Sequence, residues 1–107
     1  MLIKTIDGTQ RVSIHIERII YAESDRNHVM FHMADGTKPI CYMTLTKAHE
    51  LFPALERISQ SFIINEQELR SVVSSGHSYM FHLSNKEEIR VSRGLPYLKE
   101  FFKKYDR

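Results

Sequence analysis

Short stretches in which polar and apolar residues alternate, separated by turn-forming pairs, dominate this sequence. Apolar side chains fall at every second position over residues 11–16, and the same period recurs over residues 28–33. Because successive side chains of a β-strand point to opposite faces, this period predicts strands with one buried face. The pairs Asp7-Gly8 and Asp35-Gly36 predict turns between such strands. The chain is therefore expected to form many short strands.

The remaining segments extend this pattern and add two helices. Thr44 or Thr46 is placed to cap a short helix that continues to Phe52 and is stopped by Pro53. A C-terminal helix follows Gly94, and its expected apolar stripe is Leu95, Leu98, Phe101 or Phe102, and Tyr105. Further strands are expected at 1–6, 19–22, 38–43, 57–64, 69–74, 79–84 and 88–92, with a loop at 23–27.

The fold class predicted from these segments is mostly β. It comprises about ten short strands in small antiparallel sheets, one short internal helix and a C-terminal helix. We find no convincing internal repeat in the sequence, and its 107 residues support a single domain over residues 1–107. No apolar run approaches the ~20 residues needed to cross a bilayer. The one cysteine, Cys41, cannot form an internal disulfide and is expected to be buried, which favours a cytoplasmic location.

The charge is unevenly distributed along the chain. Residues 1–85 carry eight Lys/Arg against nine Asp/Glu, a net −1, whereas residues 86–107 carry seven against four, a net +3. A positive C-terminal segment suits an anionic partner. On charge alone, a solvated basic helix face is the more ordinary interpretation.

Catalytic motifs are absent from the sequence. It contains no phosphate-binding glycine loop, no HExxH or CxxC motif and no nucleophile elbow. His28 and His32 are four residues apart, but on a strand this spacing separates them by about 13 Å. We therefore expect no enzyme activity, no metal site and no cofactor.

One segment has a distinctive order, the run LERISQSFIIN at residues 55–65. It resembles the central signature of the LytTR family, in which His-x-Ser is followed by an aromatic residue, two aliphatic residues and Asn. The segments 19–24, 44–53 and 89–93 are similar to the family's first core strand, short helix and closing strand. The chain departs from the pattern at Ser59, where the family usually has histidine. Asn65 is interpreted as structural, making a side-chain turn to the backbone.

The resemblance implies a fold of about ten strands in three antiparallel sheets, and duplex DNA as the partner. It also implies the output domain of a bacterial two-component response regulator, with a receiver domain in the same chain, that binds direct repeats to regulate transcription. A second copy is expected on the adjacent repeat. The family's three base-contacting loop positions correspond here to His28, Gln60 and Arg93.

The chemistry of these side chains suits the role that the resemblance implies. Arginine offers a rigid fork of donors to guanine, glutamine pairs with adenine, and histidine donates to a base or a phosphate. Each also has a structural interpretation: Arg93 caps a strand end, Gln60 lies on a sheet surface, and His28 packs at a strand start. Contacts to the DNA backbone, which set register without specifying sequence, are expected from Arg26, Asn27, Arg57, Ser61 and Lys99.

Two other functions are compatible with the sequence. One is a β-rich protein-interaction or small-ligand-binding module that uses Tyr42 and Tyr79 as exposed aromatic anchors. The other is a small metal-dependent enzyme, which requires His28, His32 and His82 to converge on one site.

Overall fold

The structure, a computed structural model, describes residues 1–4, 10–94 and 96–105 and confirms the mostly β fold class. The predicted turn at Asp7-Gly8 and the side chains of Leu95 and Tyr105 lie outside what it describes. In chain order the described elements are β1 (Leu2–Lys4), β2 (Arg11–Ser13), η1 (Ile16–Arg18), β3 (Ile19–Asp25), β4 (His28–Met33), β5 (Ile40–Tyr42), α1 (Leu45–Leu51), β6 (Glu56–Arg57), β7 (Phe62–Ile64), η2 (Glu66–Glu68), β8 (Leu69–Ser75), β9 (Ser78–Leu83), β10 (Glu88–Ser92) and α2 (Pro96–Tyr105).

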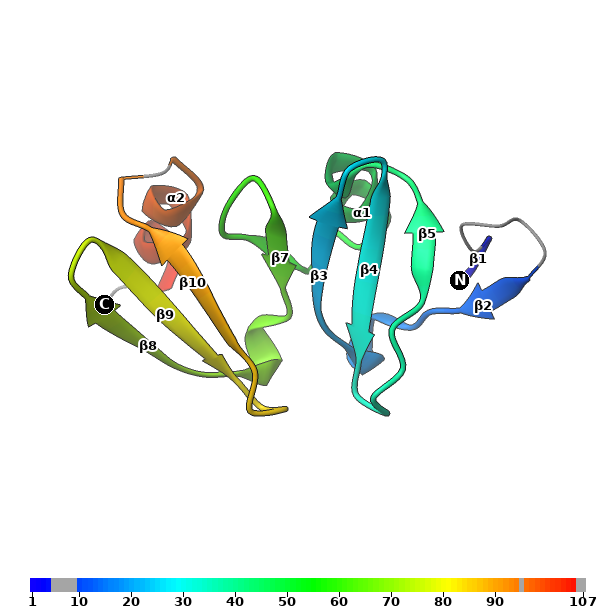
Figure 1. Cartoon of the computed structure of the whole chain (residues 1–107), viewed down its shortest axis with the longest axis horizontal. Helices are drawn as coiled ribbons and strands as arrows, with labels where there is room; N and C mark the ends of the chain where they lie inside the picture. Colours follow the sequence, from blue (N-terminus) through cyan, green and yellow to red (C-terminus); the bar gives the residue numbers. More distant parts are fainter. Residues whose placement is uncertain (5–9, 95, 106–107) are drawn as a thin grey trace.

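The ten described strands form three antiparallel sheets that follow one another along an elongated molecule (Figure 1). The small β1–β2 sheet lies at one end, and the five-stranded sheet β5-β4-β3-β7-β6 lies in the middle. The three-stranded sheet β10-β9-β8 and helix α2 occupy the other end. The principal dimensions are 43 × 24 × 21 Å.

The core consists of two clusters that meet opposite faces of the central sheet. Ile63 belongs to the cluster beneath α1, and its neighbour Ile64 belongs to the cluster beneath the three-stranded sheet and α2. Adjacent strand residues point to opposite faces, so this division follows directly from strand geometry. Helix α1 contributes Leu45 and Ala48 to the first cluster, and Thr44 caps this helix by accepting a hydrogen bond from the Lys47 amide at 3.1 Å. Cys41 is fully buried, as predicted.

Three segments differ from the sequence prediction. The strand expected over residues 11–16 ends at Ser13, and Ile16 begins the short helix η1. The expected loop at 23–27 is mostly strand, because β3 continues to Asp25 and leaves only Arg26 and Asn27 in the turn to β4. The expected single strand at 57–64 is a hairpin of β6 and β7 around a loop at 58–61. Ser59 makes this reversal possible, since its Oγ accepts hydrogen bonds from the amides of Ser61 and Phe62 at 3.0 and 3.1 Å.

The absence of an internal repeat was also predicted, and the structure contradicts it. In the β3–β4 hairpin the paired residues run from Ile19↔Met33 to Asp25↔His28, with an irregularity after Ile19. The β8–β9 hairpin repeats this register, including the irregularity, with every residue number 50 higher. Helices η1 and η2 precede the two hairpins at the same offset, and a third strand followed by an α-helix ends each unit. We call residues 16–51 the first half and residues 66–105 the second half. Few identical side chains accompany this match, which is why sequence inspection missed it.

The two halves are joined by a polar cluster. The Tyr21 hydroxyl of the first half donates to the Glu87 carboxylate of the second half. The Tyr21 ring stacks on buried His32 with 4.0 Å between ring centroids. The Nε2 atom of His32 lies 2.7 Å from Glu23 Oε1, and its Nδ1 atom lies 3.7 Å from Glu87 Oε1.

The two α-helices of the described chain, α1 and α2, are both too short and too polar to cross a membrane.

Candidate nucleic-acid interface

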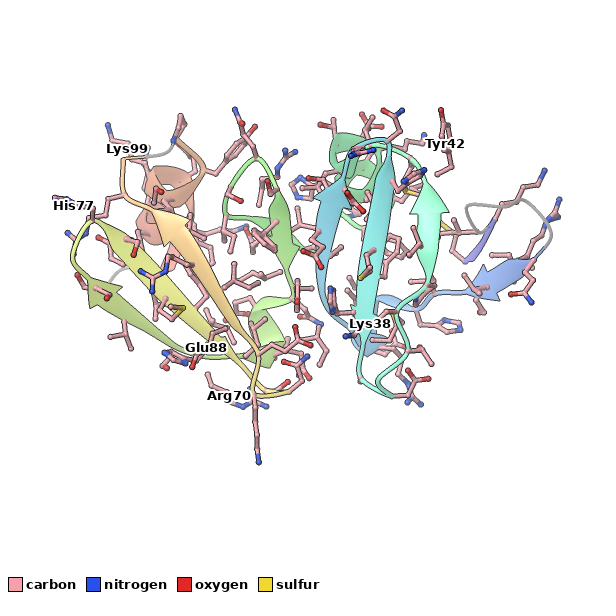
Figure 2. The ribbon with its side chains drawn as sticks, viewed as in Figure 1. Lys38, Tyr42, Arg70, His77, Glu88 and Lys99 are labelled. Carbon is pink, nitrogen blue, oxygen red and sulfur yellow. The ribbon has the colours of Figure 1, made fainter. Side chains whose placement is uncertain are left out.

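Three segments that are far apart in sequence lie along one long edge of the molecule. They are the β3–β4 turn, the β6–β7 loop and the connection from β10 to α2, all uppermost in Figure 1. We call this the loop edge; its residues are 26–28, 42, 59–61, 93, 94 and 99. Figure 2 shows Tyr42 and Lys99 on the loop edge, whereas Lys38 and Arg70 lie on the opposite edge.

Each of the three predicted base-contacting residues belongs to one of these segments. His28 is the first residue of β4, Gln60 lies in the β6–β7 loop, and Arg93 directly follows β10. Gln60 and Arg93 are exposed, and His28 is half-buried. The fold therefore brings all three to the same edge.

The β3–β4 turn is a tight two-residue connection. Arg26 adopts φ of +59°, a left-handed conformation that non-glycine residues seldom adopt, and both Arg26 and Asn27 are exposed. His28 pairs with Tyr42 of β5, and the two rings meet edge to face with 5.7 Å between centroids. The turn thus presents two polar side chains beside an aromatic pair.

Local hydrogen bonds hold the β6–β7 loop in shape. The Arg57 guanidinium donates from Nε to the Ser59 carbonyl at 2.8 Å and from Nη2 to the Gln60 carbonyl at 3.0 Å. Ser61 is exposed, and within the described part of the chain the side-chain amide of Gln60 makes no hydrogen bond. Because the Arg57 guanidinium donates to two carbonyls of the loop backbone, its geometry favours a role in positioning Gln60.

The loop and the adjacent Arg57 also contact β3 and α2, the elements that lead into the other two segments of the edge. The Ser61 carbonyl accepts a hydrogen bond from the Ser24 amide of β3 at 2.9 Å. On its other side, the Arg57 guanidinium lies 4.8 Å from the ring centroid of Tyr97 in α2. The relative positions of the three segments are therefore constrained by direct contacts.

Arg93 is held against the second hairpin. Its guanidinium lies over the Tyr79 ring at 4.7 Å from the centroid, and its Nη2 donates to the Ser74 hydroxyl. Its backbone amide donates to the His77 carbonyl at 2.9 Å. Exposed Lys99 lies nearby, and both cations line a hollow of about 380 Å³ floored by Leu98 and Phe102. These contacts orient an otherwise mobile arginine side chain.

Sequence reasoning missed the residues that support the predicted contacts. Tyr79 was considered only as an exposed anchor for a partner, yet it is half-buried, beneath Arg93 and 4.9 Å from the ring centroid of Phe102. Ser74 lies directly opposite Tyr79 in the β8–β9 register. The strands predicted at 69–74 and 79–84 are compatible with this pairing, so the register of their hairpin was the signal that could have found it.

The structure also bears on two other sequence interpretations, a metal-binding site and a structural role for Asn65. Among the described residues, no group of three or more His, Cys, Asp or Glu side chains is arranged to hold a metal ion. Asn65 makes the side-chain turn expected of it, accepting from the Gln67 amide at 3.1 Å, and its Nδ2 also donates to the Ile19 carbonyl at 2.8 Å.

The fold and the loop edge together define a class, a small mostly β domain that presents cationic and amide side chains on loops along one edge. Residues 9–106 match the family model of the LytTr DNA-binding domain, and the chain belongs to this LytTR family. DNA binding in the regulation of transcription is the function of this class of domain.

A comparison with solved structures agrees on the fold. The chain is similar to the LytTr DNA-binding domain of a protein described as a methyl-accepting/DNA response regulator from Bacillus cereus, with a TM-score of 0.80 and 19% sequence identity. The match covers 100% of this chain and 96% of that one. No curated protein sequence matches the chain.

Proposed function

We propose that this domain binds duplex DNA sequence-specifically, with the loop edge facing the major groove. The observation that carries the proposal is the convergence of His28, Gln60 and Arg93 on one edge from three separate segments (Figure 1). Base edges are recognised by donors and acceptors that enter a groove together, so convergence is what direct recognition requires.

The shape of the molecule supports the same geometry. Its longest dimension is 43 Å, which exceeds the ~34 Å helical repeat of B-DNA. In the proposed arrangement the long axis of the domain lies along the duplex, and the two ends of the loop edge are directed to successive major grooves on one face. In this arrangement Arg93, with its oriented guanidinium, contacts guanine in one groove, and His28 and Gln60 contact bases toward the other.

Contacts to the sugar-phosphate backbone complete the proposed interface. Arg26, Asn27, Ser61 and Lys99 are exposed on the loop edge and suit this role. Arg57 was also predicted to contact the backbone, and its engaged guanidinium favours an indirect contribution through the loop.

The biological setting is part of the proposal. The domain is the output module of a two-component response regulator, activated by phosphorylation of a receiver domain in the same chain. It binds imperfect direct repeats near promoters, with a second copy on the adjacent repeat, in the cytoplasm. Support comes from the family to which the chain belongs and from the response-regulator description of its structural neighbour.

The test is selection of bound sequences from a random duplex pool, followed by fluorescence anisotropy on the selected site at two salt concentrations. We expect a defined motif and an affinity that falls steeply with salt, because binding releases counterions from phosphates. Arg93→Ala is expected to lose about 1–3 kcal/mol at one base position.

Lys38→Ala and Arg70→Ala are the matched controls, since each removes one cation from the opposite edge. We expect both to bind the selected site almost as the parent does. Weak binding without an enriched motif would contradict sequence-specific recognition. Equal losses for the controls and Arg93→Ala would show that charge alone, rather than the loop edge, attracts the DNA.

A further inference from the structure

Tyr42 is a large aromatic residue that contributes little to the packing of the domain. Its side chain is 67% exposed at the end of β5, and Figure 2 shows it at the top of the molecule, on the loop edge. Within the described part of the chain its hydroxyl makes no hydrogen bond, and its one ring contact is with His28. Burial therefore does not explain an aromatic residue at this position.

The structural repeat gives this position a counterpart. Tyr42 pairs with His28 in the first half, and Ser92 pairs with Ser78 in the second half, with both residue numbers 50 higher. The end of β5 is thus equivalent to the end of β10, immediately before Arg93. Both strand ends point to the loop edge in Figure 1.

We propose that Tyr42, supported by His28, contacts the sugar-phosphate backbone of the bound DNA, with its hydroxyl donating to a phosphate oxygen. This inference rests on the proposed function and extends the interface to the β5 end of the loop edge. A phenol is a neutral donor with a flat apolar ring, so it binds a phosphate through O–H while its ring packs on the deoxyribose. Exposed Arg26, in the turn that precedes His28, makes this end of the edge attractive to a polyanion.

Backbone contact is favoured over base contact by the position of Tyr42. It lies at the end of β5, which is farther from β10 than the neighbouring strand β4 that carries His28 (Figure 1). A residue that flanks the base-contacting groups is positioned to set register on the duplex, which is what phosphate contacts do.

The experiment measures the affinity of Tyr42→Phe and Tyr42→Ala for the duplex selected by the parent domain. Loss of a hydrogen bond to a charged group predicts a decrease of about tenfold or more for Tyr42→Phe, and a larger one for Tyr42→Ala. The salt dependence and the preferred base sequence should stay unchanged, because the lost group is uncharged and does not contact bases.

A scan with single neutral methylphosphonates in the duplex locates the contact. The parent should lose affinity at several phosphates, and at one of them Tyr42→Phe should show no further loss. Val73→Ala is the control, since Val73 is 48% exposed on β8, and it should bind as the parent does. Melting temperatures of all variants should agree with that of the parent, which separates loss of contact from loss of fold.

Tyr42→Ala binding as tightly as the parent would overturn the inference, and the ring would then be open to another partner such as a protein. A changed preference at one base position would also overturn it, by making Tyr42 a base contact. In both cases the parent still binds its selected site and Arg93→Ala still weakens it. If the parent itself binds no DNA, the proposed function fails instead.

Discussion

The two halves of this domain share a hairpin geometry but differ in what covers it. Strand β3 lies between β4 and β7, and its first four residues are buried. Among the residues that the structure describes, β8 pairs only with β9, and none of its residues is buried. Ile20 of β3 is 3% exposed, and its counterpart Arg70 is exposed. The same strand register thus accommodates a buried apolar side chain in one half and an exposed cation in the other.

The difference shows that burial is decided by what packs against each hairpin rather than by the hairpin itself, since Ile20 belongs to a cluster that also contains Ile64 of β7 and Phe81 of β9. On the edge strand β8 the counterparts of the buried residues Ile20 and Tyr21 are the exposed polar residues Arg70 and Ser71, and charge there also discourages pairing with other chains. What both halves keep is the strand end that leads to the loop edge, and this common feature connects the repeat to function.

The largest expected effect concerns a core position that the two halves share. Phe31 and Phe81 occupy equivalent positions and are both fully buried. We expect Phe31→Ala and Phe81→Ala each to lower the free energy of unfolding by about 3–5 kcal/mol, measured by urea denaturation. The milder Phe31→Leu and Phe81→Leu keep the comparison measurable if the alanine variants do not fold. A large loss in one half only would show that the two cores are not equivalent.

A position that is buried in one half and exposed in the other should give different losses of stability when it is substituted. Ile20→Ala removes a buried side chain and is expected to lower the free energy of unfolding by about 2–5 kcal/mol. Arg70→Ala removes an exposed side chain whose Nη1 donates to the Gln67 carbonyl, and the change should stay within about 0.5 kcal/mol. Equal losses in the same denaturation experiment would refute the idea that the two hairpins differ in how they are packed.

The contact between Tyr21 and Glu87 across the halves predicts a loss of stability at high pH. Burial, and then the hydrogen bond to Glu87, hold the pKa of the Tyr21 phenol well above its ordinary value of 10.0. Above pH 10 the unfolded chain releases this proton while the folded domain retains it, so the free energy of unfolding falls by up to about 1.4 kcal/mol per pH unit. Below pH 10 the contribution is fully present.

Tyr21→Phe is the control for this effect. Burial also raises the pKa of Cys41, but both proteins contain that thiol, so the difference between them isolates Tyr21. Urea denaturation at several pH values from 9 to 11 should show a shallower decline for Tyr21→Phe. Parallel declines would mean that ionisation of Tyr21 does not oppose folding.

The smallest expected effect concerns the loop between the halves. Arg57→Lys keeps the charge but loses the fork of donors that binds the carbonyls of Ser59 and Gln60. We expect a decrease of about 1 kcal/mol in the free energy of unfolding. In the anisotropy assay, the salt slope should stay unchanged while preference at the Gln60 base position weakens. A reduced slope would instead indicate a direct phosphate contact by Arg57.

The sequence by itself determined the local structure and the family. Alternation located most strands, Thr44 and Pro53 bounded α1, and the run at 55–65 with its neighbouring segments indicated a LytTR domain. It also supplied the candidates His28, Gln60 and Arg93, which the fold places on one edge. Such features are predictable because they depend on the conformational preferences of neighbouring residues.

Only the tertiary structure decided which hairpin is central, that the halves repeat, and how the loop edge is assembled. The reversal at 58–61 depends on hydrogen bonds that Arg57 donates and that the Ser59 hydroxyl oxygen accepts, and the orientation of Arg93 depends on Tyr79 and Ser74. Residues 19 positions apart, such as Arg93 and Ser74, meet only because β8, β9 and β10 pair in one register. Strand pairing joins segments that are distant in sequence, and no local pattern encodes which partner each strand will find.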